Sequence, residues 1–481
     1  MPKLCDYQNE LDWGCFIVLC MTGFAFYHRT IVGLEAKKWS ATLVGMVITL
    51  FVMGNQSWHH ILVVISSIML MKCVGWRKCH IVTLVYLFSY TLIFRLTEST
   101  VKYYSRIDVN LQQMLTVLKL VGVAFDIHLT NRDKGKKATE DDSATSKHAA
   151  EDPIDPSFMD LFHYTFSYTG MVVGPYLRYR TWDDFLKLPF ARSCNAQELL
   201  RNRFPHVILA TVGCKIISYF YPIEYLLTAE FPRRHFLFRN FFNFLHLARF
   251  KMWMTSGLFM AQCISGILGM GAYPTSLHSV SANGPTKDYS HLKNITQEEA
   301  DKLDYEFETV NTLNLYNIHW TPWHSEFWRN WNKTVQYFMG RYIYKEIFRG
   351  MVTDYRILLT MLFSAYWHGI ELGYFTSLVL CGVYIVAEKP YHKMYEYTTG
   401  WGSTAFLMAM WTIQAHIFGH VMMSFLVLEP NYIFIHAAAM NFVPYFSLIF
   451  FFLFGRVALI YLQKDRSLVS SKLFFWETNY K

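Results

Sequence analysis

Residues 357–380 form an apolar stretch that reads ILLTMLFSAYWHGIELGYFTSLVL. The stretch belongs to a longer apolar run, 356–388, which is long enough for a pair of membrane spans because about 20 residues cross a bilayer as a helix. Lipid offers no hydrogen-bond partners to the backbone, so the run is predicted to be helical. A polar, ionisable side chain is costly to bury in such a run, and this makes His368 the first candidate functional residue.

Apolar runs of similar character recur along the whole chain. They predict an all-α protein, a polytopic membrane helical bundle of about ten to twelve spans. The first run follows an acidic start and is predicted to be a retained span rather than a cleaved signal. This first run lies at 13–27. Further runs lie at 41–54, 60–75, 80–95, 110–129, 206–227, 252–271, 404–428 and 432–462.

The composition also indicates a membrane protein. Of the 481 residues, 53% are hydrophobic, 18% are aromatic and only 17% are charged, against about 25% charged in ordinary soluble domains. The net charge of +8 is concentrated in short loops, which suits contact with the headgroups of the lipid bilayer. The sequence has no basic stripe of the kind that binds nucleic acid, so no nucleic-acid partner is expected. The nine cysteines include no CxxC pair, so neither a metal site nor a disulfide framework is expected.

Polar segments divide the chain into four parts. We predict N-terminal membrane spans over 1–130, a disordered polar linker over 131–155, a catalytic membrane core over 156–465 and a C-terminal tail over 466–481. Lys and Arg follow the first, third and fifth runs, which places the N-terminus outside the cytosol. In the polar insertion 276–308, the charged stretch 298–308 is expected to form a surface helix.

A second polar region, 327–345, begins FWRNWNKTVQ. On one helix, Arg329, Asn332 and Gln336 would share a face at i, i+3 and i+7, as a polar stripe among aromatic residues. Buried amides and histidines more often serve structure than chemistry: Asn332 would then bond a neighbouring helix, and His368 a nearby carbonyl. Only the sequence context favours a catalytic role for either residue.

Together these segments resemble the membrane-bound O-acyltransferase family, whose members pair an intramembrane histidine with an upstream asparagine. SAYWHG at 364–369 and WNKTVQ at 331–336 match that pair in order and spacing. GPYLRYRTW at 174–182 and GAYP at 271–274 are similar to the lysophosphatidylinositol acyltransferase branch. The likeness covers most of the chain and departs from the family in the linker, the insertion and the C-terminal tail.

The resemblance implies a helical bundle that encloses a catalytic chamber in the endoplasmic reticulum membrane. The implied substrates are acyl-CoA and a lysophospholipid, with lysophosphatidylinositol acylated at sn-2 by a polyunsaturated chain. Acyl-CoA brings its own activation as a thioester, so no bound cofactor is expected. The alternative within the family is an acyltransferase that uses another lysophospholipid as its acceptor.

Imidazole has a pKa suited to removing a proton from the acceptor hydroxyl near neutral pH, so His368 is expected to be the general base. Asn332 would orient the hydroxyl or donate to the developing oxyanion, and the sequence leaves both roles open. The basic and polar residues expected to hold the CoA phosphates or the phosphoinositol headgroup are Arg329, Gln336, Lys345, Arg178 and Arg180. For each basic residue, simple snorkelling to the membrane surface is an equally good interpretation.

Other classes of protein find weaker support. The HxxxH spacing of His416 and His420 fits one box of a di-iron desaturase, but the remaining boxes are missing. His128 and Asp133 have the His-x4-Asp spacing of another acyltransferase class, at a span end where a preorganised site is not expected. A transporter would line its pathway with intramembrane Arg, Asn and His, yet the chain shows no inverted repeat.

Overall fold

The computed structural model describes residues 17–101, 107–137, 152–171 and 174–464. The start of the first predicted span, most of the predicted linker and the predicted C-terminal tail therefore lie outside the described residues. Within them the protein is helical, with two small two-stranded sheets. This arrangement confirms the all-α, multi-pass membrane class that the apolar runs predict.

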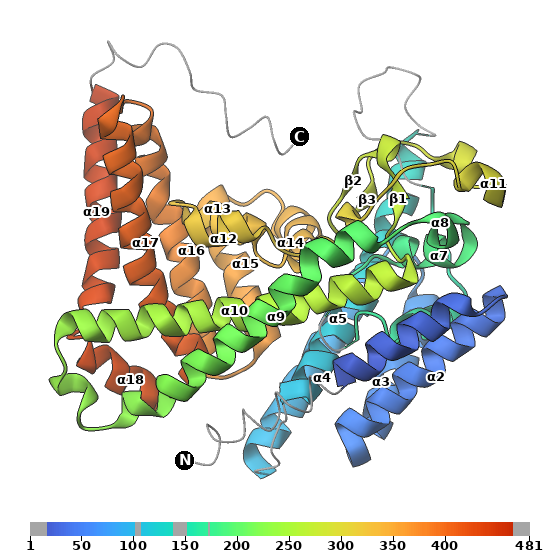
Figure 1. Ribbon diagram of the computed structural model, residues 1–481, viewed down its shortest axis with the longest axis horizontal. Helices are drawn as coiled ribbons and strands as arrows, with labels where there is room; N and C mark the ends of the chain where they lie inside the picture. The colour runs from blue at the N-terminus through green and yellow to red at the C-terminus, as the bar shows by residue number, and fades with distance from the viewer. Residues whose placement is uncertain (1–16, 102–106, 138–151, 172–173, 465–481) are drawn as a thin grey trace.

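The first half of the chain forms helices that lie together on the right of Figure 1. Residues 17–30 are helical, and the helices that follow are α2 (Leu34–Met53), α3 (Ser57–Val74), α4 (Cys79–Val101), α5 (Ile107–Lys137), α6 (Phe158–Phe166), α7 (Tyr179–Lys187) and α8 (Phe190–Ser193). Helix α6 begins with a capping box, in which the Ser157 hydroxyl and the Asp160 carboxylate each accept the other residue's backbone N–H. The α5 helix runs into the predicted linker as far as Lys137.

Two long helices, α9 (Gln197–Phe220) and α10 (Phe236–Leu268), connect the two sides of the molecule. Beyond them, α16 (Leu372–Tyr395), α17 (Trp401–Val427) and α19 (Val443–Lys464) stand side by side, with α18 (Pro430–Ala439) below (Figure 1). Between the two sides lie the shorter elements α12 (Leu315–Trp320), α13 (His324–Asn330), α14 (Lys333–Phe338), the π-helix η7 (Met339–Ile347) and α15 (Thr353–His368).

Six helical segments of the described chain are long and apolar enough to cross a membrane, or seven if the bent pair α18 and α19 counts as one span. The six do not include α10 or α15, which cover two of the predicted runs. Helix α15 has 16 residues, which gives about 24 Å of length at 1.5 Å per residue. That is shorter than the roughly 30 Å hydrocarbon core of a bilayer, so α15 spans only part of its thickness.

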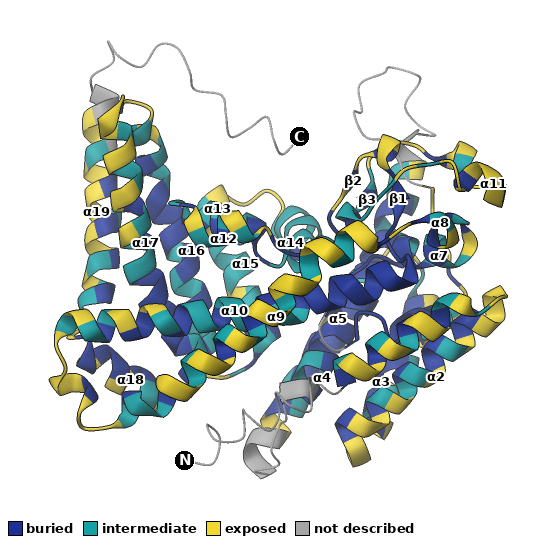
Figure 2. Cartoon of the chain, in the orientation of Figure 1, coloured by how far each residue is buried: buried dark blue, intermediate teal, exposed yellow. Residues whose placement is uncertain are grey.

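Burial differs sharply between the helices (Figure 2). In the most apolar 18-residue stretch of α5, 94% is buried inside the protein, whereas in the corresponding stretch of α9 only 17% is buried. Helix α5 is therefore a central element, and α9 turns most of its apolar side chains outward, as a helix facing lipid does.

Two large apolar clusters form the interior. The first combines α2 to α7 with residues from η7 and with Trp367 at the end of α15. The second combines α10, α13, α16, α17 and α19, and it contains Trp331. The end of α15 and the segment between α13 and α14 therefore lie where the two clusters approach each other.

The insertion differs from the prediction. The stretch 298–308 is not one surface helix: α11 (Gln297–Ala300) is a single turn, and β4 (Tyr305–Glu306) then pairs antiparallel with β1 (Tyr273–Pro274). A second pair joins β2 (Ser279–Val280) to β3 (Gly284–Pro285). The strands take up backbone hydrogen bonds that a helix would otherwise have satisfied.

Candidate active site

His368 is the last residue of α15. Its imidazole is half-buried and lies among three aromatic rings, with centroid distances of 4.7 Å to Trp367, 5.7 Å to Tyr374 and 5.1 Å to Phe425. Within the described residues, neither ring nitrogen has a hydrogen-bond partner. The carbonyl contact expected of a structural histidine is therefore not found, and the ring is available to a ligand.

The residues before His368 are fastened to α4 and α5. The Tyr366 hydroxyl donates to the Phe88 carbonyl at 2.7 Å, and the Trp367 indole N–H donates to the Met114 carbonyl at 3.1 Å. Both aromatic side chains thus find polar partners inside the apolar interior. The end of α15 is held on one side, while the imidazole points to the other core cluster.

Asn332 lies between α13 and α14 in the left-handed conformation, with φ 37° and ψ 60°. Asparagine tolerates this region better than other residues with a side chain. Its Oδ1 accepts from the Thr334 hydroxyl at 3.3 Å, and that hydroxyl oxygen accepts the backbone N–H of Tyr176 at 3.2 Å. No partner for the amide nitrogen of Asn332 occurs among the described residues, so the side chain has N–H groups to donate.

The predicted stripe on one helix is wrong. Helix α13 ends at Asn330, Trp331 is extended, and α14 begins at Lys333. Gln336 keeps its place one turn beyond Asn332, because its backbone N–H donates to the Asn332 carbonyl at 2.9 Å. Arg329 lies on the preceding helix instead. The left-handed Asn332 interrupts the helical hydrogen bonds that a continuous stripe requires.

A row of aromatic rings joins the two candidate catalytic segments. Trp331 stacks on Phe250 at 5.6 Å, Phe250 contacts Phe425 at 5.5 Å, and Phe425 contacts His368 at 5.1 Å. The row runs through α10 and α17, which belong to the second core cluster. An apolar row of this kind would keep water away from a thioester bound beside it.

Glu388 of α16 fixes the helix that leads into Asn332. Its two carboxylate oxygens accept the backbone N–H groups of His324 and Ser325, each at 2.7 Å, in the first turn of α13. Glu388 is only 1% exposed. These N–H groups have no partner within their own helix, so the carboxylate satisfies them. The sequence carried a signal for Glu388, since it ends the apolar run 356–388 as a buried charge.

Arg178 is part of an internal network. It is 4% exposed, and its guanidinium pairs with both oxygens of Asp126 at 2.9 and 3.1 Å and donates to Asn283 Oδ1 at 2.9 Å. The Tyr342 hydroxyl donates to Asp126 at 2.7 Å. The pair of Arg178 and Asp126 therefore joins α7, α5, η7 and the β2–β3 turn.

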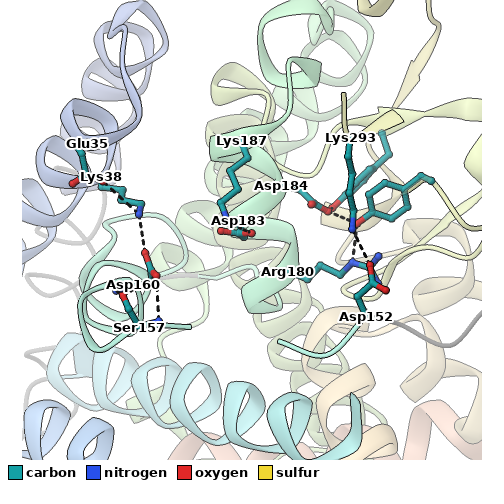
Figure 3. A network of polar contacts seen from close by, with 12 residues as sticks. Glu35, Lys38, Asp152, Ser157, Asp160, Arg180, Asp183, Asp184, Lys187 and Lys293 are labelled. Carbon is teal, nitrogen blue, oxygen red and sulfur yellow. Dashed lines mark hydrogen bonds and ion pairs between the residues drawn. The ribbon is translucent and has the colours of Figure 1, made fainter. Parts of the chain in front are cut away.

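Arg180 lies on α7 in the polar network of Figure 3. Its Nε donates to the Tyr289 hydroxyl at 2.8 Å, and its guanidinium lies 4.8 Å from the centre of that ring. The hydroxyls of Tyr273 and Tyr289 both donate to Asp184. Burial raises the pKa of Asp184 above its ordinary value, although the two tyrosine hydrogen bonds act in the opposite direction. Beside this group, Lys293 pairs with Asp152 at 2.8 Å.

Lys345 belongs to a basic cluster on η7 and the start of α15. Burial lowers the pKa of Lys345, and the positive charges of Arg341 and Arg356 lower it further. A neighbouring carboxylate, that of Glu346, pairs with Arg132 at 2.9 Å. An anionic ligand would relieve this repulsion. Arg329 is half-exposed, and its Nη1 lies 3.5 Å from Glu326.

The two histidines of the HxxxH pattern, His416 and His420, each contact a side chain of another helix. His416 Nδ1 lies 2.7 Å from Asn240 Oδ1, and the His420 ring stacks on His436 at 4.4 Å. In the part of the chain that the structure describes, no group of three or more His, Cys, Asp or Glu side chains is arranged to hold a metal ion. The structure therefore does not assemble a di-iron site from these histidines.

Comparison with known proteins agrees with this arrangement. The chain is 28% identical to the membrane-bound acylglycerophosphatidylinositol O-acyltransferase mboat7 of Xenopus laevis, over 93% of this chain and 94% of that protein. It is 29% identical to each of the proteins of the same name from Bos taurus and Homo sapiens, over 87% of this chain and 88% of each relative. The family model of the membrane-bound O-acyltransferases matches residues 39–428. This chain is therefore an acyltransferase that belongs to the membrane-bound O-acyltransferase family.

Proposed function

We propose that this protein transfers an acyl chain from acyl-CoA to the free hydroxyl of a lysophospholipid, and specifically to the sn-2 hydroxyl of lysophosphatidylinositol. The names of the relatives, which the chain matches over most of its length, support the inositol headgroup. The choice of a polyunsaturated chain and of the endoplasmic reticulum membrane rests on resemblance to the family. The observation that carries the chemistry is the imidazole of His368, which has no hydrogen-bond partner in the described chain and lies against the ring of Phe425.

In this mechanism His368 accepts the proton of the lysophospholipid hydroxyl as its oxygen attacks the thioester carbonyl. The tetrahedral intermediate then expels the CoA thiolate, which takes the proton back from the imidazolium. No bond forms between the enzyme and the acyl chain. Asn332 donates a hydrogen bond from its unpaired amide nitrogen, either to the oxyanion or to the acceptor hydroxyl. The residue would thus stabilise charge that develops only during the reaction.

Basic side chains on two sides would hold the charged parts of the substrates. Lys345 and its cationic neighbours fit the CoA phosphates, and Arg329 and Gln336 lie on the helices on either side of Asn332. Arg180, half-exposed beside Tyr289, is the better candidate for the phosphoinositol headgroup. Arg178 is buried in its pair with Asp126, and we assign it to the framework that supports Arg180.

We also infer that about ten to twelve membrane passes surround a catalytic chamber. Helices that do not themselves cross the bilayer, such as α15, would line that chamber. The sequence boundaries at 130, 155 and 465 separate the N-terminal spans, the linker, the catalytic core and the tail.

The test is an acyltransferase assay on microsomes with a panel of lysophospholipids and acyl-CoAs. His368→Ala should lower the rate at least 100-fold, since general bases contribute about 10² to 10⁴. His416→Ala is the matched control, because His416 also lies in an apolar helix but is bonded to Asn240. A folded His368→Ala protein with near wild-type activity would overturn the mechanism. Equal activity on lysophosphatidylcholine would overturn only the choice of headgroup.

A further inference from the structure

The carbonyl end of α15 carries a polar contact that the mechanism above does not use. In a helix the last carbonyl groups have no partner within the helix. The backbone N–H of Gly369 satisfies the Ala365 carbonyl at 3.1 Å, which leaves the carbonyls of Tyr366, Trp367 and His368. In a membrane interior these groups must find donors elsewhere in the protein.

Two side chains from other helices supply the donors. Arg95 of α4 donates from Nη1 to the Tyr366 carbonyl at 2.7 Å and from Nη2 to the Trp367 carbonyl at 2.7 Å. Asn110 of α5 donates from Nδ2 to the His368 carbonyl at 3.0 Å. Arg95 Nη2 also donates to Asn110 Oδ1 at 2.9 Å, which links the two donors.

Arg95 is an expensive residue for this position. It lies in an apolar span and is only 8% exposed, and a charge inside a membrane is rare unless it has a function. The negative end of a helix dipole is a favourable partner for a cation. The planar guanidinium also matches two neighbouring carbonyls at once, which a lysine ammonium does not.

We propose that Arg95 and Asn110 are positioning residues for His368. They hold the backbone of residues 366–368, and the imidazole is then the polar group of that turn with no bonded partner in the described chain. Without them the last turn of α15 would fray, and the imidazole would lose its contacts with the rings of Tyr374 and Phe425. The inference rests on the proposed role of His368 as general base.

The test compares four variants of the full-length protein, purified in detergent micelles with lipid. Arg95→Met removes both donors, Arg95→Lys keeps the charge, and Asn110→Asp removes one donor with almost no change in shape. Arg29→Met is the matched control, because Arg29 also donates to two distant backbone carbonyls, those of Ile267 at 3.1 Å and Cys194 at 2.9 Å. Turnover is normalised to folded protein, and the thermal midpoint is measured for each variant.

We expect Arg95→Met to lower kcat about 100-fold with both KM values within about twofold, because small displacements of a reacting group have effects of this size. Asn110→Asp should lower kcat about tenfold, and Arg95→Lys should fall between wild type and Arg95→Met. Arg29→Met should lower the thermal midpoint but keep the wild-type kcat. Wild-type kcat in folded Arg95→Met and Asn110→Asp, or an equal kcat loss in Arg95→Met and Arg29→Met, would overturn the inference.

His368→Ala and the double variant Arg95→Met/His368→Ala separate this inference from the proposed function. If Arg95 acts through His368, the double variant should be no slower than His368→Ala alone. A further loss in the double variant would show that Arg95 acts by another route. If His368→Ala remains active, the proposed mechanism fails first, whatever Arg95 does.

Discussion

At the residue scale, His368 and Asn332 each keep polar atoms without a partner in the described chain, a property that they share with other interior side chains such as His246 and His420. Arg178 is buried and His416 is half-buried, and the Arg178 guanidinium pairs with Asp126 while His416 Nδ1 lies against Asn240 Oδ1. A buried polar group that lacks a partner costs stability. Such a cost is consistent with a ligand that completes the hydrogen bonds.

The first prediction concerns the amide of Asn332. Asn332→Gly keeps the left-handed backbone without strain and removes only the side chain. We expect kcat to fall about 100-fold or more, the effect of losing one oxyanion donor, with little change in thermal stability. Steady-state kinetics on purified protein would measure it. Asn332→Asp, which keeps the shape but cannot donate, should fall by a similar factor; wild-type kcat in both variants would rule out the donor role.

At the element scale, helix ends rather than helix middles form the candidate site. His368 ends α15, Asn332 separates α13 from α14, and Glu388 satisfies the first turn of α13. Helix ends present unpaired backbone groups, so they need partners from other elements. These partners fix the ends in place, and the candidate catalytic side chains are held by the same contacts.

The second prediction tests the contact of Glu388 with α13. Glu388→Gln keeps one acceptor oxygen and loses the charge, so the variant should be less stable by about 2 kcal/mol. It should also have a lower kcat, because α13 leads into Asn332. Thermal unfolding and kinetics are measured together. Glu230→Gln is the control: its pair with Arg234 is exposed, and its loss should leave the stability almost unchanged because solvent screens the pair. Equal stability of the two variants would contradict the prediction.

The third prediction concerns the close contact of α16 and α17 beside His368. A Cβ at Gly373 would lie 2.2 Å from the Ser424 carbonyl, so Gly373→Ala must push the two helices apart. Tyr374 and Phe425, which flank His368, follow these positions in sequence. We expect a loss of stability and a kcat at least about tenfold lower. A Cβ at Gly402 meets nothing within 4 Å, so Gly402→Ala should keep activity; wild-type behaviour of Gly373→Ala would show that the helices can separate without cost.

At the scale of the whole molecule, the site lies between two core clusters that contain Trp367 and Trp331 respectively. The first cluster combines residues from both sides of the polar linker, since Tyr342 and Trp367 pack with helices of the first half. The network of Asp126, Arg178 and Tyr342 makes the same connection with polar groups. The linker therefore separates two parts of the sequence, but residues from both parts pack into one apolar core.

The fourth prediction tests whether Arg178 belongs to this framework. Arg178→Met leaves Asp126 as an unpaired buried charge and should destabilise the protein by about 3 to 5 kcal/mol. The double variant Arg178→Met/Asp126→Leu should recover part of that loss. Thermal unfolding of the three proteins measures both effects. If Arg178→Met is as stable as wild type and instead raises the KM for lysophosphatidylinositol, Arg178 binds the headgroup after all.

The sequence by itself determined the membrane class, the helical fold and the two motifs around His368 and Asn332. These features depend on local composition and on the order of residues, because lipid forces apolar segments to satisfy their own backbone groups. The helical stripe of Arg329, Asn332 and Gln336 failed because a single left-handed residue interrupts it, and periodicity does not reveal that conformation.

Only the tertiary structure decided which polar residues bind other groups of the protein and which do not. Arg95 and Asn110 meet the end of α15 from 271 and 258 residues away along the chain, and Glu388 meets α13 from 64 residues away. Hydrogen bonds between such distant residues follow from how the helices pack. In the sequence, Arg178, Arg95 and His368 are alike as polar residues in apolar surroundings; in the fold, two of them bind the protein's own groups, and the imidazole of His368 stays open.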